Sequence, residues 1–380
     1  MASAPELNAP AGWLASRWTR LNGPRRVAGV DLARGLAVIG MIAAHVLWID
    51  DLDIADAATW VAVVEGRSSI LFATLAGVSI GLVTGGRTPL EAGAMHTARM
   101  RLAVRAGLLW LIGLALIATG VPVYVILPAY AILFLLALPL TGLRAKPLLM
   151  IAGGLALVMP VVQVGLDAAP VWSTAAGQIV SPLIGWHYPF PVWIAFVAAG
   201  LGVARAGIGR PAVEARLLGY GAALSVLGYG ADALNGVGPA SGASSFWAAL
   251  WTAEPHSTGL WEVIGSGGFA LAVLGACLLA CRTVVTWIVL PLRAVGAMPL
   301  TAYVVQLVVW AVVATTVLGS AGDLRGFRDL EPFWPMTLGL VLGCTMWALL
   351  VGRGPLEWAL DRAARAVGRG APHDADRLSG

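Results

Sequence analysis

The stretch RRVAGVDLARGLAVIGMIAAHVLWIDD, residues 25–51, decides the fold class, because it is an apolar run of transmembrane length with polar groups near both ends. Asp31, Arg34 and His45 lie within or against that run. On a helix with 3.6 residues per turn, their side chains fall in one sector of roughly 60°. Asp31 and His45 are then about 21 Å apart along the axis, most of the way across the hydrocarbon. The segment therefore predicts a membrane-spanning helix with a polar contact near each membrane surface.

Composition extends this prediction to the whole chain. Of the 380 residues, 59% are hydrophobic and only 12% are charged, and the mean hydropathy is +0.83. These values exclude an ordinary soluble domain, and the long uninterrupted apolar runs favour helices over a β-barrel. We expect an all-α, polytopic membrane helix bundle of about ten transmembrane helices. The apolar runs fall at 27–49, 67–84, 103–120, 122–140, 147–166, 187–204, 215–234, 262–281, 297–319 and 333–351.

Charge predicts the orientation of the bundle. An even number of spans places both termini on one side of the membrane. Arginines are concentrated in the N-terminal segment, in alternate loops and in the C-terminal segment, so both termini are expected to be cytoplasmic. We expect a cytoplasmic lead at 1–26, a single transmembrane helical domain at 27–351 and a cytoplasmic tail at 352–380. The lead lacks the apolar run of a secretory signal, and around Trp13 to Leu21 it is either a surface helix or disordered.

Several classes of partner and site are not indicated by the sequence. The pI of about 9.2 follows from arginines spread over successive inner loops, which is membrane topology and not a nucleic-acid footprint. Cys277, Cys281 and Cys344 lie in apolar runs without metal or redox spacing, so neither a metal nor a disulfide is expected. Lipid-facing and partner-facing helix surfaces are both apolar, which leaves a homo-oligomer open.

The predicted outer face is acidic and rich in tryptophan. An aromatic belt at the headgroup level explains such tryptophans, and so does a sugar-binding cleft, so both readings stay open. The tryptophans in question are Trp48, Trp60, Trp172, Trp186, Trp247, Trp251, Trp261 and Trp334.

Polar residues inside the apolar runs are the candidates for chemistry. Asp31 and Arg34 either form an interfacial ion pair or belong to a binding site, and His45 is either structural or a proton-handling group. His256 lies between Glu254 and Ser257 in the longest outer loop, roughly 235–261, as an acid/base candidate or as part of an ordinary polar loop.

Further polar and small residues lie in or beside other helices. His187 is expected in the outer half with His45 and His256. Tyr303 and Gln306, at i and i+3, are expected to face the bundle interior. Gly77, Gly81 and Gly85 are expected chiefly to allow close helix packing. Arg99, Arg101 and Arg105, ahead of the third helix, could hold phosphates, although positive-inside topology alone also explains them.

Six blocks of the chain carry a family resemblance. Residues 26–45 read RVAGVDLARGLAVIGMIAAH and 66–82 read GRSSILFATLAGVSIGL, and later blocks are HYPFPVWIAFVAAGLGVAR (187–205), EPHSTGLWEVIGSGGFALAVLG (254–275), AMPLTAYVVQ (297–306) and GPLEWAL (354–360). They resemble the transmembrane acyltransferases related to heparan-α-glucosaminide N-acetyltransferase, in particular their bacterial relatives. Asp31, Arg34 and Gly35 match the D-x-x-R-G motif of that family.

The resemblance implies a multi-pass enzyme of the bacterial cytoplasmic membrane. It would take an acyl group from cytoplasmic acyl-CoA, with acetyl-CoA as the expected donor, and pass it to a hydroxyl or amine of an outer-face glycan or glycolipid. The donor is expected at Asp31, Arg34, Gly35, Arg99, Arg101 and Arg105, with His45 as general base and His256 as the second choice. His45 stands where the animal enzyme has asparagine, so its role rests on its own chemistry. The competing hypothesis is a proton-coupled transporter of an amphipathic or lipid-linked solute.

Overall fold

The computed structural model describes residues 12–23, 26–53, 55–235 and 246–367, and the described chain is all-α, as predicted. Within those residues, nine helices are long and apolar enough to cross a membrane. They are α2 (Ala28–Val46), α3 (Arg67–Val83, with the 3₁₀ helix η1, Ala57–Val64, before it), α4 (Ala92–Ile117), α6 (Ala145–Asp167), α8 (Phe190–Gly207), α9 (Pro211–Asn235), α11 (Leu260–Ala280), α14 (Pro299–Leu318) and α16 (Phe333–Leu350).

Shorter helices connect and flank these spans. They are α1 (Trp13–Asn22), α5 (Leu127–Ala137), η2 (Pro139–Gly142), η3 (Pro170–Ser173), α7 (Ala175–Ile184), α10 (Phe246–Leu250), α12 (Val285–Ile288), α13 (Leu290–Ala297), α15 (Leu324–Asp329) and α17 (Pro355–Val367). The segment around Trp13 to Leu21 is thus a helix, α1. The predicted outer loop 235–261 contains residues 236–245, which lie outside the described residues.

The predicted span at 122–140 is the exception in length, because its helix α5 has only 11 residues. Pro128 lies in the first turn of α5, a position that suits proline because no intrahelical N–H is needed there. Most of α5 is buried inside the bundle. A segment buried in protein need not cover the full bilayer thickness with helix, since neighbouring helices shield its backbone from lipid.

Helix α4 starts earlier than the apolar run that predicted it. The sequence suggested a loop that carries Arg99, Arg101 and Arg105, followed by a span from residue 103, whereas α4 begins at Ala92 and contains all three arginines. The residues from 92 to 102 include alanine, methionine, arginine and leucine, which are strong helix formers even where they are not apolar. All three arginines therefore lie on one helix, with Arg101 and Arg105 one turn apart and Arg99 on another side.

The bundle has a buried centre and an apolar surface. Helices α2 and α8 have the largest buried shares among the candidate spans, and α9 and α16 are among the least buried. Leu157, Val226, Val312 and Leu342, on four outer helices, are all more than half exposed. Apolar side chains exposed on this scale suit contact with hydrocarbon and not with water. The chain is therefore a multi-pass membrane protein.

Close helix crossings depend on glycine at the predicted positions. A Cβ on Gly77 of α3 would lie 2.8 Å from the carbonyl carbon of Val197 in α8, and Gly81 faces Ala204 of α8. The packing role predicted for Gly77 and Gly81 is thus confirmed. Gly85 lies beyond the end of α3 with φ of +117°, so it serves the turn and not the helix crossing.

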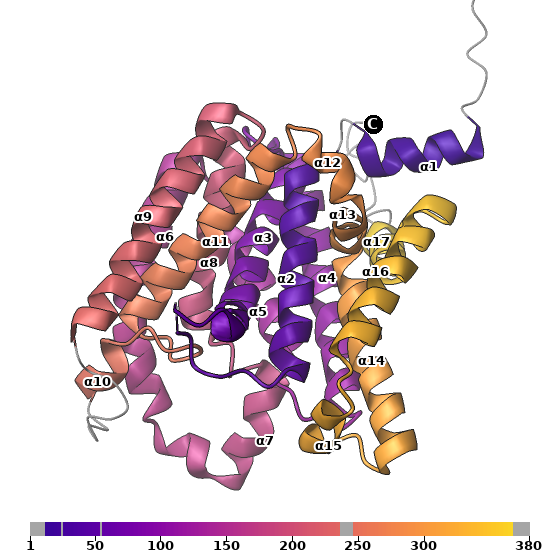
Figure 1. Ribbon diagram of the computed structural model, residues 1–380. Helices are drawn as coiled ribbons and strands as arrows, with labels where there is room; N and C mark the ends of the chain where they lie inside the picture. Colours follow the sequence, from indigo (N-terminus) through magenta and orange to yellow (C-terminus); the bar gives the residue numbers. More distant parts are fainter. Residues whose placement is uncertain (1–11, 24–25, 54, 236–245, 368–380) are drawn as a thin grey trace, which may run out of the picture.

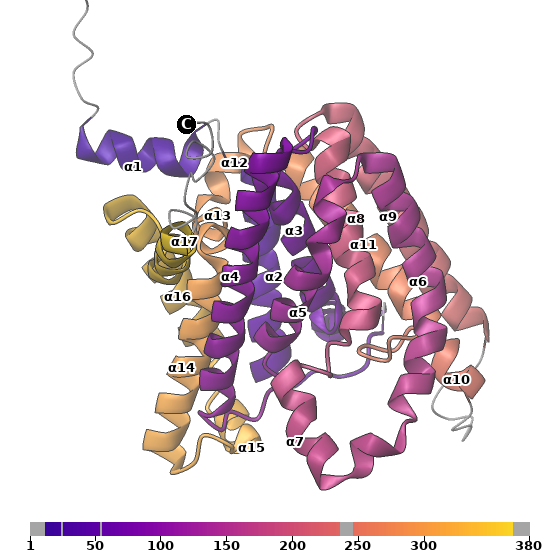
Figure 2. The ribbon, with the colours of Figure 1, turned by 180° about the vertical axis from the view of Figure 1, so that it is seen from behind.

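The two ends of the bundle differ in their elements. Figures 1 and 2 show α1, α12 and α17 at one end, and α7, α10 and α15 at the other. We name these the inner and outer ends, following the predicted cytoplasmic location of the termini. Within the predicted tail, α17 packs against α4 and α14, so this part of the tail belongs to the packed body of the protein.

Candidate functional site

At the inner end, one buried carboxylate joins two arginines. Asp31, in the first turn of α2 and 2% exposed, accepts hydrogen bonds from Arg26 at 2.8 and 3.1 Å and from Arg34 Nη1 at 3.0 Å. Arg34 Nη2 also donates to the hydroxyl of Ser79 in α3, at 2.7 Å. The ion pair between Asp31 and Arg34, predicted from their spacing, therefore exists, and together with the bond to Ser79 it fixes the Arg34 guanidinium between α2 and α3.

The three motif residues have different structural roles. A Cβ on Gly35 would overlap the carbonyl oxygen of Leu292 in α13, and a Cβ on Gly296 of α13 would overlap that of Asp31. Gly35 thus allows α2 and α13 to touch at the backbone. Asp31 orients Arg34, and of the three Arg34 is the one that lines the inner cavity, described below.

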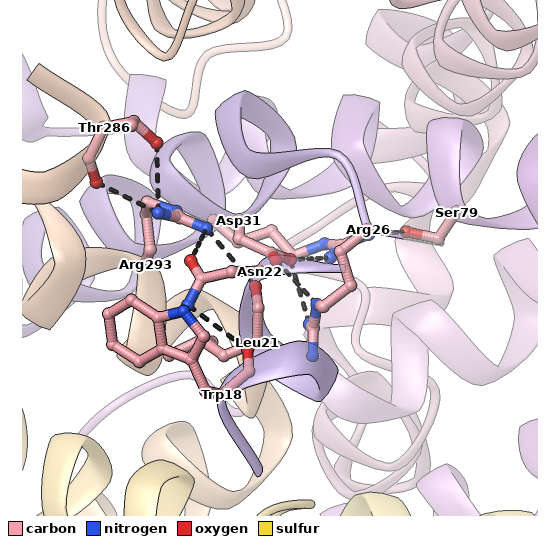
Figure 3. Close-up of polar contacts among 9 residues, drawn as sticks. Trp18, Leu21, Asn22, Arg26, Asp31, Ser79, Thr286 and Arg293 are labelled. Atoms are coloured by element: carbon pink, nitrogen blue, oxygen red, sulfur yellow. Dashed lines mark hydrogen bonds and ion pairs between the residues drawn. The ribbon is translucent and has the colours of Figure 1, made fainter. Parts of the chain in front are cut away.

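At the same end of the bundle, Arg293 of α13 is buried, at 2% exposed, and links two elements. Figure 3 shows its guanidinium between two elements: Nη1 donates to the backbone oxygen and the hydroxyl of Thr286, each at 3.0 Å, and Nη2 donates to Asn22 Oδ1 at 2.9 Å. The indole rings of Trp18 and Trp287 stack with centroids 5.6 Å apart. These contacts hold α1 on the inner end of the bundle.

The inner cavity has a volume of about 170 Å³ and lies between α2, α3, α4, α5, α14 and α17. Its polar lining residues are Arg34, Ser79, Arg105, Tyr130, Tyr303 and Glu357. Glu357 of α17 accepts from the backbone amides of Leu300 and Thr301 at 2.8 and 3.1 Å, so its charge is offset by the N-terminus of α14. The cavity therefore presents two guanidinium groups and one carboxylate that is already hydrogen-bonded.

The three arginines of α4 are separated by the structure. Arg105 lines the inner cavity, whereas Arg101 is exposed and does not line it. Arg99 donates from Nε to the hydroxyl of Thr141 at 3.0 Å, also away from the cavity lining. Of the six residues predicted to hold the donor, only Arg34 and Arg105 line the cavity.

The outer cavity brings together three histidines that are far apart in the sequence. It has a volume of about 270 Å³, and His45, His187 and His256 all line it. The ring centroids of His187 and His256 are 5.0 Å apart, and His187 stacks on Tyr124 at 3.7 Å. Within the described ranges, no group of three or more His, Cys, Asp or Glu side chains has the geometry to hold a metal ion.

An adjoining cavity of about 390 Å³ widens the outer site, and the two share Pro122, Val123, Tyr124, His187 and Tyr188. No tryptophan is among the described residues that line either one. The tryptophans of the outer face therefore fit an aromatic belt better than a sugar-binding cleft.

His45 is held by two contacts at the outer end of α2. Its Nδ1 is 2.8 Å from the side-chain amide nitrogen of Gln306, and its backbone oxygen accepts from Nε of Arg328 at 3.2 Å. Gln306 and Tyr303 are each 2% exposed, which confirms that they face the interior. The assignment of the amide nitrogen and oxygen can be exchanged, so Gln306 can donate a hydrogen bond to Nδ1 or accept one from Nδ1–H. In the second arrangement, the lone pair of Nε2 is free.

The loop that carries His256 is organised by Glu262 and not by Glu254. Glu254 is exposed, whereas Glu262 is 3% exposed and accepts from the backbone amides of His256 at 2.7 Å and Thr258 at 2.6 Å. His256 and Thr258 have φ of +64° and +54°, a region that costs free energy for residues other than glycine. The pairing of His256 with Glu254 suggested by the sequence is therefore replaced by a buried carboxylate that imposes the loop conformation.

Burial keeps two of the histidines uncharged. Burial lowers the pKa of His187 from its ordinary 6.5 to about 4, with a further lowering from the neighbouring His256. Burial also lowers the pKa of His256. Both imidazoles are therefore neutral at pH 7 and can accept a proton.

The two cavities share a partition. Tyr130 lines the inner cavity and is 3% exposed, and its hydroxyl donates to the backbone oxygen of Ser69 at 3.4 Å. Ser69 lines the outer cavity. Arg34 and His45, one in each cavity, are eleven residues apart in α2, which is about 16 Å along the helix. Tyr130, a lining residue of the inner cavity, therefore contacts a lining residue of the outer cavity directly.

Several residues of the site were not identified as such from the sequence. Glu357, Tyr130 and Arg328 carried no local pattern that marked them. Glu262 did carry a signal, because it is a lone acid in the first turn of an apolar helix, where an ionisable residue indicates a specific partner.

Two protein families match overlapping parts of the chain. Residues 26–228, which include Asp31, Arg34, His45 and Arg105, match the family of the heparan-alpha-glucosaminide N-acetyltransferase catalytic domain. Residues 210–366 match a family described as a protein of unknown function, DUF418. A search of curated proteins gave no match. Because the first match spans more than half of the 380 residues, the chain belongs to the heparan-alpha-glucosaminide N-acetyltransferase family of membrane acetyltransferases.

Proposed function

We propose that the protein transfers an acetyl group from acetyl-CoA in the inner cavity to a hydroxyl or amine that enters the outer cavity. The observation that carries this proposal is the pair of cavities on either side of Tyr130, one lined by guanidinium groups and the other by three histidines. Guanidinium groups suit the phosphates of the donor, and neutral imidazole suits the acceptance of a proton.

The inner cavity fits part of the donor. Its volume of about 170 Å³ is below the roughly 300–1,000 Å³ of typical ligand pockets, so it would hold the thioester and part of the pantetheine arm. The nucleotide would remain at the mouth of the cavity, where Arg34 and Arg105 can pair with phosphate. Asp31 serves this site indirectly, because it fixes the orientation of Arg34.

The outer cavity supplies the base. The acceptor oxygen or nitrogen attacks the thioester carbonyl carbon, the carbon–sulfur bond breaks, and coenzyme A leaves as the thiolate. His45 takes the acceptor proton on Nε2 while Gln306 accepts a hydrogen bond from Nδ1–H, and the proton then passes to the leaving sulfur. His256 is the second candidate for the base. In this proposal, the thioester reaches the acceptor and His45 past the ring of Tyr130.

The proposed acceptor and location rest on the predicted topology together with the family resemblance. With both termini in the cytoplasm, the donor is cytoplasmic and the acceptor is a glycan or glycolipid at the outer face of a bacterial cytoplasmic membrane. Arginines at the inner end, including Arg99 and Arg101, then contribute to the orientation of the protein in the membrane more than to donor binding.

The test is acetyl transfer by the purified full chain in liposomes supplied with radiolabelled acetyl-CoA and an extract of outer-face glycans and glycolipids. We expect label to leave coenzyme A for the acceptor fraction and His45→Ala to slow this transfer at least a hundredfold. His96→Ala is the matched control, because His96 is exposed on α4. Full activity of His45→Ala would reject His45 as the base. No transfer from any acyl-CoA, together with proton-coupled solute uptake, would favour the transporter.

A further inference from the structure

A further cavity opens between α14 and α16, and among the described residues it shares no lining residue with the inner, outer or adjoining cavity. It has a volume of about 440 Å³, and apolar side chains, including Val305, Val309 and Leu340, form most of its lining. Val305 and Val309 are 42% and 38% exposed, so this groove is open at the side of the bundle. In a membrane, that side faces lipid.

Two glycines of α16 form part of the groove and have no packing role there. Gly339 and Gly343 are at i and i+4, so they share one face of the helix. A Cβ on either would meet no atom within 4 Å in the described part of the chain, in contrast to Gly77, where a Cβ would overlap the backbone of α8. Glycine in a helix interior costs about 1 kcal/mol relative to alanine. What the glycines provide is therefore empty volume in the groove.

Gln306 connects this groove to the outer cavity. Its side chain lines the groove and bonds Nδ1 of His45, which lines the outer cavity. The other polar atom of the amide is buried and has no hydrogen-bond partner among the described residues. This holds for either orientation of the amide, since one of its two polar atoms is always left over. An unpaired buried polar group costs about 1–3 kcal/mol, which a hydroxyl from a bound molecule would offset.

We propose that this groove binds the alkyl chain of a lipid-linked acceptor, with the polar end of that lipid at Gln306 and beside His45. The inference rests on the proposed acetyl transfer and specifies the class of acceptor. The volume of about 440 Å³ holds on the order of 15 methylene-sized groups if each takes about 30 Å³, which is one alkyl chain.

The direction of the groove fits a lipid of the outer leaflet. Its lining runs from Pro335, near the outer start of α16, past Gln306 and Cys344 to Trp347, near the inner end of α16. An outer-leaflet lipid points its chain inward from a polar head at the outer surface. A chain in the groove therefore leaves the head at the outer cavity, where His45 and Arg328 lie.

The first experiment measures binding without enzyme activity. The full chain in phosphatidylcholine nanodiscs is photolabelled with a dodecyl glucoside that carries a diazirine in its alkyl chain. We expect labelled peptides from α14 and α16, competition by unlabelled dodecyl glucoside, and at least a tenfold loss of labelling in Gly343→Leu. Gly343→Ala, a smaller filler, should give an intermediate loss.

Gly154→Leu is the matched control, because Gly154 of α6 also has nothing within 4 Å of a Cβ and does not line the groove. Its labelling should equal that of the wild type. Equal labelling of all lipid-facing helices, without competition and without an effect of Gly343→Leu, would overturn the proposal.

The second experiment separates this inference from the proposed function. Membranes that contain the protein receive radiolabelled acetyl-CoA, and the products are divided into solvent-extractable and water-soluble fractions. Label in the extractable fraction that is lost in Gly343→Leu, with acetyl-CoA binding unchanged, supports a lipid-linked acceptor. Water-soluble product alone, formed equally by Gly343→Leu, overturns the inference and leaves the acetyltransferase intact. Saturable labelling of the groove without any acetyl transfer would reject the proposed function but not the alkyl site.

Discussion

Tyr130 and Ser69 line opposite cavities and are joined by a hydrogen bond from the tyrosine hydroxyl to the serine backbone oxygen, at 3.4 Å. The Tyr130 side chain thus lies between Arg34 and Arg105 in one cavity and a wall residue of the cavity that His45 and the two other outer histidines line. In an acetyltransferase that works across a membrane, such a partition keeps water from the thioester until an acceptor is present.

Removal of the ring of Tyr130 should therefore uncouple the two halves of the reaction. In Tyr130→Leu, we expect hydrolysis of acetyl-CoA without acceptor to rise severalfold and transfer to fall, because water reaches the thioester. Tyr130→Phe keeps the ring and should stay within about twofold of the wild type, since it loses one long hydrogen bond. Release of free thiol measures hydrolysis. Unchanged hydrolysis in Tyr130→Leu would mean that the ring does not separate the cavities.

Gln306 should act through His45. Gln306→Leu leaves Nδ1 of His45 without its partner at 2.8 Å, and we expect kcat to fall about tenfold while the KM for acetyl-CoA is unchanged. Glutamate in Gln306→Glu can accept a hydrogen bond from Nδ1–H, so this variant should restore much of the rate. It should also move the acidic limb of the pH–rate profile, because a carboxylate favours the charged imidazole. A loss in both variants, with an unchanged pH profile, would indicate that Gln306 is merely structural.

Glu262 should be essential for the geometry of the His256 loop. Glu262→Gln can accept from only one of the two amides, those of His256 and Thr258, so we expect a loss of about 1–3 kcal/mol in stability and a lower kcat. Glu254→Gln, in the same loop but exposed, should change neither quantity. Thermal unfolding in detergent and the transfer assay provide the two readouts. A Glu262→Gln protein with the melting temperature and rate of the wild type would contradict this role.

His187 should make stability depend on pH in a defined window. Its pKa is about 4 in the folded protein and close to the ordinary 6.5 when unfolded, so the unfolded chain binds more protons between these values. The contribution of His187 to the free energy of unfolding should be fully present above pH 6.5 and should be lost as the pH drops from 6.5 towards 4. We expect the melting temperature of His187→Phe to depend less on pH over this range. Some dependence should remain, because burial lowers the pKa of His256 as well. A wild-type melting temperature that rises on acidification would refute the assignment.

The sequence predicted the membrane fold and the polar residues at the two ends of the bundle, because these depend on local patterns. Apolar length predicts a span, and a polar residue within a span predicts a partner; both arguments placed Arg34, His45 and Gln306 where the structure has them. The three outer histidines could be expected at one end from the alternation of spans alone.

The rest depended on contacts that no local pattern encodes. Arg101 and Arg105 are the same residue type one turn apart, yet of the two only Arg105 lines the inner cavity, because the packing of α4 against α5 and α17 decides it. Glu254 is the nearer carboxylate to His256 in sequence, yet Glu262 holds the loop through backbone amides. The α14–α16 groove depends on how two separate helices diverge, which the spacing of Gly339 and Gly343 does not reveal.

The most direct test of the central claim is calorimetric binding of acetyl-CoA to the purified wild type, Arg105→Ala, Arg101→Ala and His45→Ala. The account predicts a dissociation constant at least tenfold higher for Arg105→Ala, because Arg105 lines the inner cavity and should pair with donor phosphate. Arg101→Ala and His45→Ala should bind like the wild type, since Arg101 is exposed and His45 belongs to the outer cavity. Equal weakening by Arg105→Ala and Arg101→Ala, or loss of binding in His45→Ala, would contradict a donor site in the inner cavity.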